Sequence, residues 1–180
     1  MGCAAPEAPG SSVDEPERIE PARAPLVEVD ASSLDALIDE HDGHPLLLNV
    51  WSTWCEPCAE ELPGILRVAR EHRARGLRLV LISTDPPVMR EAASAFLHDL
   101  GAPEPSYLRV GPDDPFIRAV DAHFDEAEWS GALPLTLLFD ESGSAADVWL
   151  EPVQEQALAR AVDSVLATGG TESTAREETR

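Results

Sequence analysis

The chain has 180 residues, 43% of them hydrophobic, which is enough for one ordinary domain with a sizeable core and flanking tails. Its 34 acidic residues outnumber the 13 basic ones and leave a formal net charge of -21, so the phosphates of nucleic acids and anionic membrane surfaces should repel it. Its three cysteines are too few for a scaffold held together by disulfides, and no stretch of about 18 apolar residues could cross a bilayer.

The two ends of the chain lack the large apolar residues that a core requires. Residues 1–25 contain repeated prolines among alanine, glutamate, serine and glycine, which predicts a disordered linker or tether. Residues 168–180 are equally polar and predict a disordered acidic tail. The folded domain should therefore run from residue 26 to residue 167.

Short strands and helices alternate through this domain. In chain order they are a strand at 26–29, a helix at 33–40, a strand at 46–51, a helix at 59–75, a strand at 77–83, a helix at 88–100, a strand at 107–110, a helix at 115–123, strands at 135–140 and 145–150, and a helix at 153–166. The runs at 46–51 and 77–83 are typical of parallel strands buried on both faces, and a Gly-containing turn after residue 140 predicts a closing hairpin. The sequence thus predicts an α/β fold with a central mixed β-sheet flanked by helices.

A Cys-Glu-Pro-Cys motif stands where the strand at 46–51 passes into its helix. Cys55 should lie at the helix N-terminus, where unpaired backbone N–H groups and the helix dipole stabilise a thiolate and lower the thiol pKa from about 8.5. Pro57 suits the first helical turn, because a missing N–H costs nothing there. We therefore expect Cys55 to be the attacking thiol and Cys58 to be the resolving thiol.

Two cysteines this close could also form an inert bridge or half of a zinc site. A tetrahedral zinc site needs two further ligands, and the paired histidines, His41 and His44, have two residues between them instead of the usual three to five. We therefore expect no metal and no cofactor beyond the redox-active Cys55–Cys58 disulfide. In the expected reaction Cys55 attacks a substrate disulfide and Cys58 resolves the mixed disulfide, and the reverse sequence oxidises a substrate.

The order of strand, Trp-x-x-Trp-Cys-x-Pro-Cys and helix is similar to the thioredoxin superfamily. The longer string from Leu48 to Pro63 resembles the ResA/TlpA-like group of extracytoplasmic bacterial thioredoxins, many of which reduce apocytochrome c or other envelope disulfides. The resemblance covers about residues 26–167. It implies a thioredoxin-like fold in which residues 87–110 are an inserted helix-strand element, and a thiol–disulfide oxidoreductase that acts as a reductase in the bacterial cell envelope.

The same resemblance assigns roles to two polar residues. Asn49 stands where ordinary thioredoxins have a buried proton-accepting Asp, so that role is vacant. Glu61 matches a Glu of the ResA-like pattern and is the candidate to accept a proton or to tune the thiol pKa values, which an ionised neighbour would raise. The alternative is a solvated first-turn Glu that merely suits the helix dipole, which is the expected role of Glu60.

A substrate-binding surface is implied around the cysteines. Pro134 matches the superfamily's cis-proline, whose geometry would leave the backbone of Leu133 exposed for strand-like pairing with a bound client. Trp54, Glu56 and Pro57 adjoin the cysteines in sequence and complete the expected surface.

Other residues have less specific expectations. The connection at 121–130 is longer and more acidic than in the ResA/TlpA-like group and is expected to help to choose the substrate. His123 and Trp129 could line that surface, or they could be packing residues. His72 and His98 lie on predicted helices and are expected to be exposed.

The N-terminal Met-Gly-Cys resembles a bacterial lipoprotein cut back to its lipobox, with Cys3 as the lipidated residue. A stray cytosolic cysteine is the alternative. The resemblance implies a periplasmic or envelope protein, attached to a membrane only through Cys3. Its partners would be protein disulfide or dithiol clients and a membrane dithiol electron donor, with no nucleic acid, and it would be a monomer.

Two other functions share this fold. A peroxiredoxin-like peroxidase normally has a Pro-x-x-x-Thr-x-x-Cys string, but Leu48 and Ser52 occupy those places here. A copper-binding assembly protein typically has its cysteines one residue further apart and a distant His ligand, for which His123 is the candidate. Both alternatives remain open at this stage.

Overall fold

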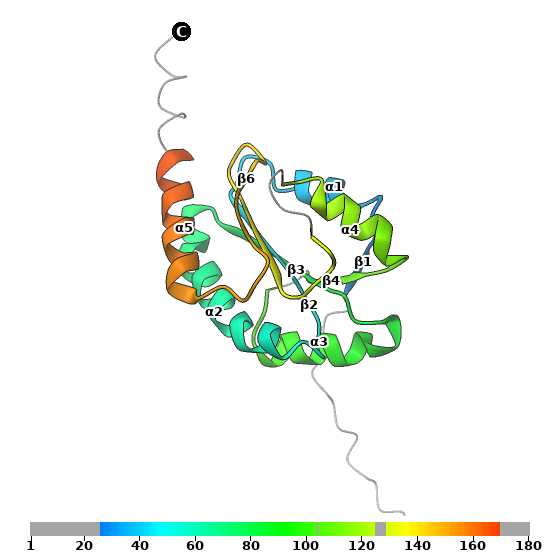
Figure 1. The fold of residues 1–180 in the computed structure, drawn as a ribbon. Coiled ribbons are helices and arrows are strands. Elements are labelled where there is room, and N and C mark those ends of the chain that lie inside the picture. The colour runs from blue at the N-terminus through cyan, green and yellow to red at the C-terminus, as the bar shows by residue number, and fades with distance from the viewer. Residues whose placement is uncertain (1–25, 104, 125–128, 170–180) are drawn as a thin grey trace, which may run out of the picture.

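The computed structural model describes residues 26–103, 105–124 and 129–169. The expected linker at 1–25 and the tail from residue 170 onward lie outside these described residues. In the described part, a single sheet carries helices on both faces (Figure 1).

Six strands form a mixed sheet in the order β1-β4-β3-β2-β5-β6. Their bounds, in that order, are Val27–Val29, Tyr107–Arg109, Arg78–Ser83, Leu46–Trp51, Leu135–Phe139 and Ala145–Trp149. The first four in this order pair in parallel, β5 is antiparallel to β2, and β6 is antiparallel to β5. The predicted mixed sheet, its central parallel strands and its closing hairpin are confirmed.

Helices α2 (Glu56–His72), α3 (Arg90–Asp99) and α5 (Glu155–Gly169) cover one face of the sheet, and α1 (Leu34–Asp39) and α4 (Asp113–Asp121) cover the other (Figure 1). Short 3-10 turns, η1 (Arg73–Arg75) and η2 (Pro87–Met89), follow α2 and precede α3. The predicted helix and strand of the inserted element are α3 and β4.

The sequence predicts that the domain ends at residue 167, but α5 continues to Gly169. The side-chain hydroxyl of Thr168 donates to backbone carbonyls one turn earlier, at Ser164 and Val165. A side chain that bonds back to its own helix supports this last turn, which composition alone did not reveal.

Strand β2 is buried along its whole length. Leu46, Leu48 and Val50 face α1 and α4, while Leu47 and Trp51 pack on the side of α2, α3 and α5. This two-sided burial is why the strand is almost entirely apolar. Asn49, the one polar residue of β2, therefore requires a hydrogen-bond partner inside the protein.

One surface expectation fails because of helix packing. His72 is buried, with Nδ1 2.8 Å from the carbonyl oxygen of Val68 and Nε2 3.3 Å from Asp163 of α5. Since α5 packs over α2, the histidine is covered and its second ring nitrogen finds a partner on α5. His98, at the end of α3, is exposed as expected.

Candidate active site

Cys55 and Cys58 form a disulfide at the start of α2, with their Cα atoms 5.3 Å apart. Cys55 is the N-cap residue of the helix, and its sulfur accepts a hydrogen bond from the backbone N–H of Cys58 at 3.2 Å. Pro57 lies in the first turn, as predicted. Cys55 is 5% exposed and Cys58 is fully buried, so the expected division into an attacking and a resolving thiol agrees with their access to solvent.

The two sulfur atoms lie in an apolar cluster between the sheet and the helices α2 and α3. Trp51, at the end of β2, belongs to this cluster and stacks on Phe96 with ring centroids 5.3 Å apart. Leu133 packs against the same cluster, so it borders the redox site as expected. Trp54 is 67% exposed and is therefore free to contact a client.

Glu61 is buried one helical turn beyond Cys58. Its Oε1 accepts from Asn49 Nδ2 at 2.9 Å, and its Oε2 accepts from the backbone N–H of Val153 at 2.8 Å. Burial raises the pKa of Glu61, and the hydrogen bonds from Val153 and Asn49 oppose that rise. The solvated alternative is wrong for Glu61, whereas the neighbouring Glu60 is exposed.

Asn49 connects this carboxyl group to the strand that follows the cis-proline. Its Nδ2 lies 2.9 Å from the hydroxyl of Thr136 and 3.3 Å from the carbonyl oxygen of Leu135, both in β5. An amide neither takes up nor releases a proton at ordinary pH, so Asn49 positions Glu61 but cannot replace it in proton transfer. Glu61 is the group of this network that can titrate, and residues three apart on a helix are neighbours, which leaves it beside Cys58.

The Leu133–Pro134 peptide bond is cis, as predicted for Pro134. The preceding segment is tied down by Trp129, whose ring N–H donates to the carbonyl oxygen of Ala132 at 2.6 Å. The backbone N–H of Trp129 also donates to Asp121 at 2.8 Å, and its side chain is buried. Trp129 is thus a packing residue that supports the cis-proline segment.

Sequence reasoning missed Asp85, which holds the segment just before Cys55. Its buried carboxylate accepts from the backbone N–H of Thr53 at 2.9 Å, from the hydroxyl of Thr53 at 2.6 Å and from the hydroxyl of Ser83 at 2.8 Å. Asp85 follows β3, and the carboxyl ends of the parallel strands β2 and β3 meet at one edge of the sheet. That shared edge, where ligand sites gather in α/β folds, was the available signal.

A second feature missed from sequence is apolar surface beside the disulfide. Val88 is 87% exposed and Met89 is 39% exposed, and both follow Asp85 within η2. Because Asp85 is bonded to Thr53, they lie at the same edge of the sheet as Trp54. We refer to Trp54, Val88 and Met89 as the apolar rim.

The remaining predicted site residues are placed as follows. Glu56 and Pro57 are exposed beside the disulfide, and Cys3 lies outside the described residues. His123 has its Nε2 3.1 Å from Asp35 of α1, on the opposite side of the sheet from the cysteines. Among the residues that the structure describes, no cluster of three or more His, Cys, Asp or Glu side chains is placed to hold a metal ion. No helix within the described ranges is long and apolar enough to cross a membrane.

A disulfide between a helix N-cap and the residue three positions later, at the end of a central strand of this sheet, defines a thioredoxin-like thiol–disulfide oxidoreductase. The AhpC/TSA family model matches residues 22–149, and the chain belongs to that family.

Curated relatives agree with this class. The thiol:disulfide interchange protein HelX of Rhodobacter capsulatus is 27% identical over 154 residues, which cover 83% of this chain and 73% of HelX. The thiol-disulfide oxidoreductase ResA of Geobacillus kaustophilus is 21% identical over 140 residues, covering 78% and 74% of the two chains. The thiol:disulfide interchange protein DsbE of Xylella fastidiosa is 35% identical over 102 residues, covering 56% of this chain and 44% of DsbE.

Solved structures agree on the fold. A secreted thiol-disulfide isomerase from Corynebacterium glutamicum superposes with a TM-score of 0.60 at 22% identity, covering 72% of this chain and 75% of that one. A DsbF homologue from Corynebacterium diphtheriae gives a TM-score of 0.59 at 24% identity, covering 71% and 75%. The family match and the curated relatives confirm the resemblance to the thioredoxin superfamily, and the solved structures agree with it in fold.

Proposed function

We propose that this oxidoreductase works as a reductase of protein disulfides in the bacterial cell envelope, with apocytochrome c as a representative client. One observation carries the direction of the reaction: a buried carboxyl group, Glu61, lies one helical turn beyond Cys58, and Glu56 and Glu60 add two further acidic side chains to the start of the same helix. The interchange and oxidoreductase names of HelX, ResA and DsbE support the same class of reaction.

The charge around the cysteines bears on the reduction potential. Oxidising members of the superfamily stabilise the reduced form by lowering the thiol pKa of the attacking cysteine. Here the first turns of α2 carry Glu56, Glu60 and Glu61, and the first cationic side chain of the helix is Arg67. Negative charge near a thiolate destabilises it, so the disulfide is favoured relative to the dithiol and the potential falls. A low potential is the property of a reductant.

The proposed reaction begins with the reduced protein. The Cys55 thiolate attacks one sulfur of a client disulfide, the client S–S bond breaks, and the departing client thiolate takes up a proton. Cys58 then passes its proton to the Glu61 carboxylate and attacks the Cys55 sulfur, which releases the second client thiolate. That thiolate is protonated in turn, with Glu61 as the nearby proton source. The client gains two electrons and two protons, and Cys55–Cys58 becomes a disulfide that a membrane dithiol donor must reduce.

The client is proposed to lie across the disulfide. The apolar rim offers apolar contact on one side, and the backbone at Leu133 and Pro134 offers strand-like pairing on the other. Glu56 and Pro57 are exposed between the two cysteines and complete the contact. A client held in this way presents its sulfur to Cys55, the cysteine with solvent access.

The proposed compartment is the periplasm or cell envelope, where disulfide exchange with exported proteins takes place. Two structural neighbours that are secreted proteins support this location. Lipidation of Cys3 would hold a monomer at the membrane. Mass spectrometry of the protein purified from membranes tests the lipid, because a diacylglycerol adds a large and characteristic mass to the N-terminal peptide.

The deciding experiment is the reduction potential of the Cys55–Cys58 couple, measured by equilibration with dithiothreitol or glutathione buffers and thiol trapping. A value of about -250 mV or lower supports a dedicated reductant, and a value near about -120 mV contradicts the proposal, because it marks an oxidant. The client class is tested with Cys58→Ser and an oxidised Cys-x-x-Cys-His peptide, which should accumulate as a mixed disulfide. A matched Cys-x-x-Cys peptide without the His is the control for specificity.

A further inference from the structure

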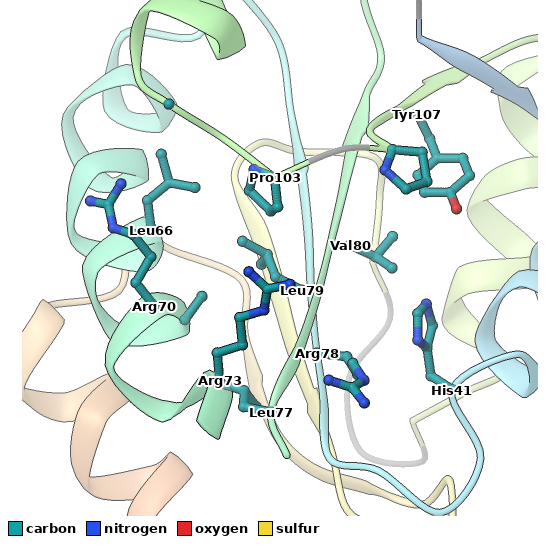
Figure 2. A pocket seen from close by; sticks show the side chains of 13 residues that line it. His41, Leu66, Arg70, Arg73, Leu77, Arg78, Leu79, Val80, Pro103 and Tyr107 are labelled. Carbon is teal, nitrogen blue, oxygen red and sulfur yellow. The ribbon is translucent and has the colours of Figure 1, made fainter. Parts of the chain in front are cut away.

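A cavity of about 350 Å³ lies at the end of α2 that is remote from the disulfide. It exists because β4 pairs with β3 only at Ile82 and Ser83, so the first half of β3 has no neighbour on that edge among the described strands. The C-terminal half of α2, η1 and the residues Gly101, Pro103 and Pro105 form its walls (Figure 2). Small-molecule sites typically have volumes of about 300–1,000 Å³, so this cavity is of a suitable size.

The floor of the cavity is apolar, and cationic side chains lie at its edge. Leu79 and Val80 of β3 lie between the α2 side chains on one side and His41 with Tyr107 on the other (Figure 2). Arg70, Arg73 and Arg78 also line the cavity. A few polar groups around an apolar floor are the usual pattern of a site that holds an organic molecule in one orientation.

These three arginines lack an ion pair and line one cavity, whereas Arg118 and Arg160, which also lack an ion pair among the described residues, do not line it. Elsewhere on the described surface, ion pairs join Arg67 to Glu155, Arg75 to Asp163, Arg90 to Glu28 and Arg109 to Asp113. No carboxylate of the described residues lies within salt-bridge distance of Arg70, Arg73 or Arg78, although the chain has 34 acidic residues. The helix dipole accounts for Arg70 and Arg73 at the end of α2, but Arg78 belongs to a strand.

An uncharged histidine ring completes the lining. Burial lowers the pKa of His41, so near neutral pH the ring carries no charge. Its Nε2 atom has almost no accessible surface, so a molecule in the cavity contacts the rest of the ring and not this atom.

We propose that this cavity is a binding site for a small amphipathic organic anion, whose carboxylate, sulfonate or phosphate group is held by Arg70, Arg73 and Arg78 and whose apolar body lies over Leu79 and Val80. Guanidinium groups bind such anionic groups through paired hydrogen bonds. Arg70 is fifteen residues along the helix from Cys55, or about 22 Å at 1.5 Å per residue, so this site is separate from the redox site. The inference does not depend on the proposed reductase activity.

The test uses 1-anilinonaphthalene-8-sulfonate, an anionic group on an apolar body, as the probe in fluorescence titrations of the full chain. One saturable site is expected, and dodecanoate or dodecyl phosphate should displace the probe, whereas uncharged dodecanol should not. The relative strength of the two anions distinguishes a carboxylate from a phosphate ligand. The proposal would be overturned if dodecanol displaced the probe as effectively as dodecanoate does. It would also be overturned if hexaglutamate displaced the probe and dodecanoate did not, because that result would indicate a groove for an acidic peptide.

Matched variants locate the site. Arg70→Ala combined with Arg78→Ala should weaken probe binding at least about tenfold, the loss of one charge-assisted contact or more. Arg118→Ala combined with Arg160→Ala removes the same two charges from exposed positions on α4 and α5 and should change binding less than about twofold. Equal affinity of the double variant and the wild type would refute the site. In Cys55→Ser, which has no redox chemistry, binding should be unchanged, so failure of this proposal and failure of the reductase proposal are distinguishable.

Discussion

The two ends of α2 carry opposite charges and differ in what covers them. At the N-terminal end, both carboxylate oxygens of Glu61 accept hydrogen bonds inside the protein. At the C-terminal end, Arg70 and Arg73 line a cavity without a carboxylate partner among the described residues. The helix dipole favours acidic groups at the first end and basic groups at the second, so it does not explain this difference in burial.

The elements that neighbour each end of α2 explain this difference in burial. Strands β2 and β5 and residue Val153 close over Glu61, whereas β4 stops short of the first half of β3 and leaves the other end open. A charge in a closed environment acts on the groups buried beside it, here the cysteine sulfur atoms. A charge at an open cavity acts on whatever binds from outside. The following predictions separate these two roles.

The largest effect is expected at the closed end, from the cysteines themselves. Cys55→Ser should lower insulin reduction at least about a thousandfold, because it removes the nucleophile. Cys58→Ser should instead accumulate mixed disulfides, visible on non-reducing gels. Turnover that survives in Cys55→Ser would refute the assignment of the attacking thiol.

Replacing the buried carboxyl group should slow the second half of the reaction. Glu61→Gln should reduce the rate of mixed-disulfide resolution by about a hundredfold, the lower end of the usual contribution of a positioned proton acceptor. Burial raises the pKa of Glu61, so in the wild type this rate should increase as pH passes through that raised pKa. Glu61→Gln should lack that rise, as stopped-flow measurements across a pH series would show.

Glu60→Gln is the matched control, since it removes a carboxylate from the adjacent, exposed position. Its resolution rate and pH profile should resemble those of the wild type. If both glutamine variants slowed the reaction equally, Glu61 would act only through general surface charge.

The same carboxyl group should make stability depend on pH. Because its pKa is raised in the folded protein, the folded state keeps this proton at pH values where the unfolded chain has lost it. Stability is therefore retained below the ordinary value of 4.5 and lost as pH rises through the raised pKa. The free energy of unfolding of Glu61→Gln, relative to wild type, should increase from about pH 4 to about pH 8 in urea titrations. A constant difference across that range would contradict the burial argument.

An intermediate effect is expected at the segment before Cys55. Asp85→Asn replaces a carboxylate oxygen by an N–H donor facing donors at Thr53 or Ser83, so it should lower the free energy of unfolding by about 1–3 kcal/mol. Thr53→Val removes only the hydroxyl partner of Asp85 and should have a smaller effect. Urea unfolding measures both, and a neutral Asp85→Asn would show that this network does not hold the segment.

The smallest effect is expected at the open end. Arg70→Ala should lower stability by only about 0.3–1 kcal/mol, the value of a favourable helix-dipole interaction. The potential of the Cys55–Cys58 couple and the rate of insulin reduction should not change. A shifted potential would show that the two ends of α2 are coupled.

Local patterns in the sequence predicted much of this molecule. Apolar runs indicated β2 and β3, and the Cys-Glu-Pro-Cys motif placed a cysteine pair at a helix start. The cis bond before Pro134 came from family resemblance, because an isolated X-Pro sequence does not specify its isomer. These features depend on residues close to one another in the chain.

Contacts between distant segments were not predictable in the same way. The bonds from Asp85 to Thr53, the burial of His72 under α5 and the cavity beside β3 each bring together residues far apart in sequence. Glu60 and Glu61 are adjacent and chemically identical, and sequence reasoning left both the buried and the solvated role open for Glu61.

The sequence by itself determined the element order, the strand that is buried on both faces and the position of the redox cysteines, because hydrophobic periodicity and helix-start residues act over short distances. Only the tertiary structure decided which glutamate is buried behind the disulfide, which aspartate holds the segment before Cys55 and which arginines face a cavity. The physical reason is that desolvation and ion pairing depend on what the rest of the chain packs against each group, and that packing exists only in the folded protein.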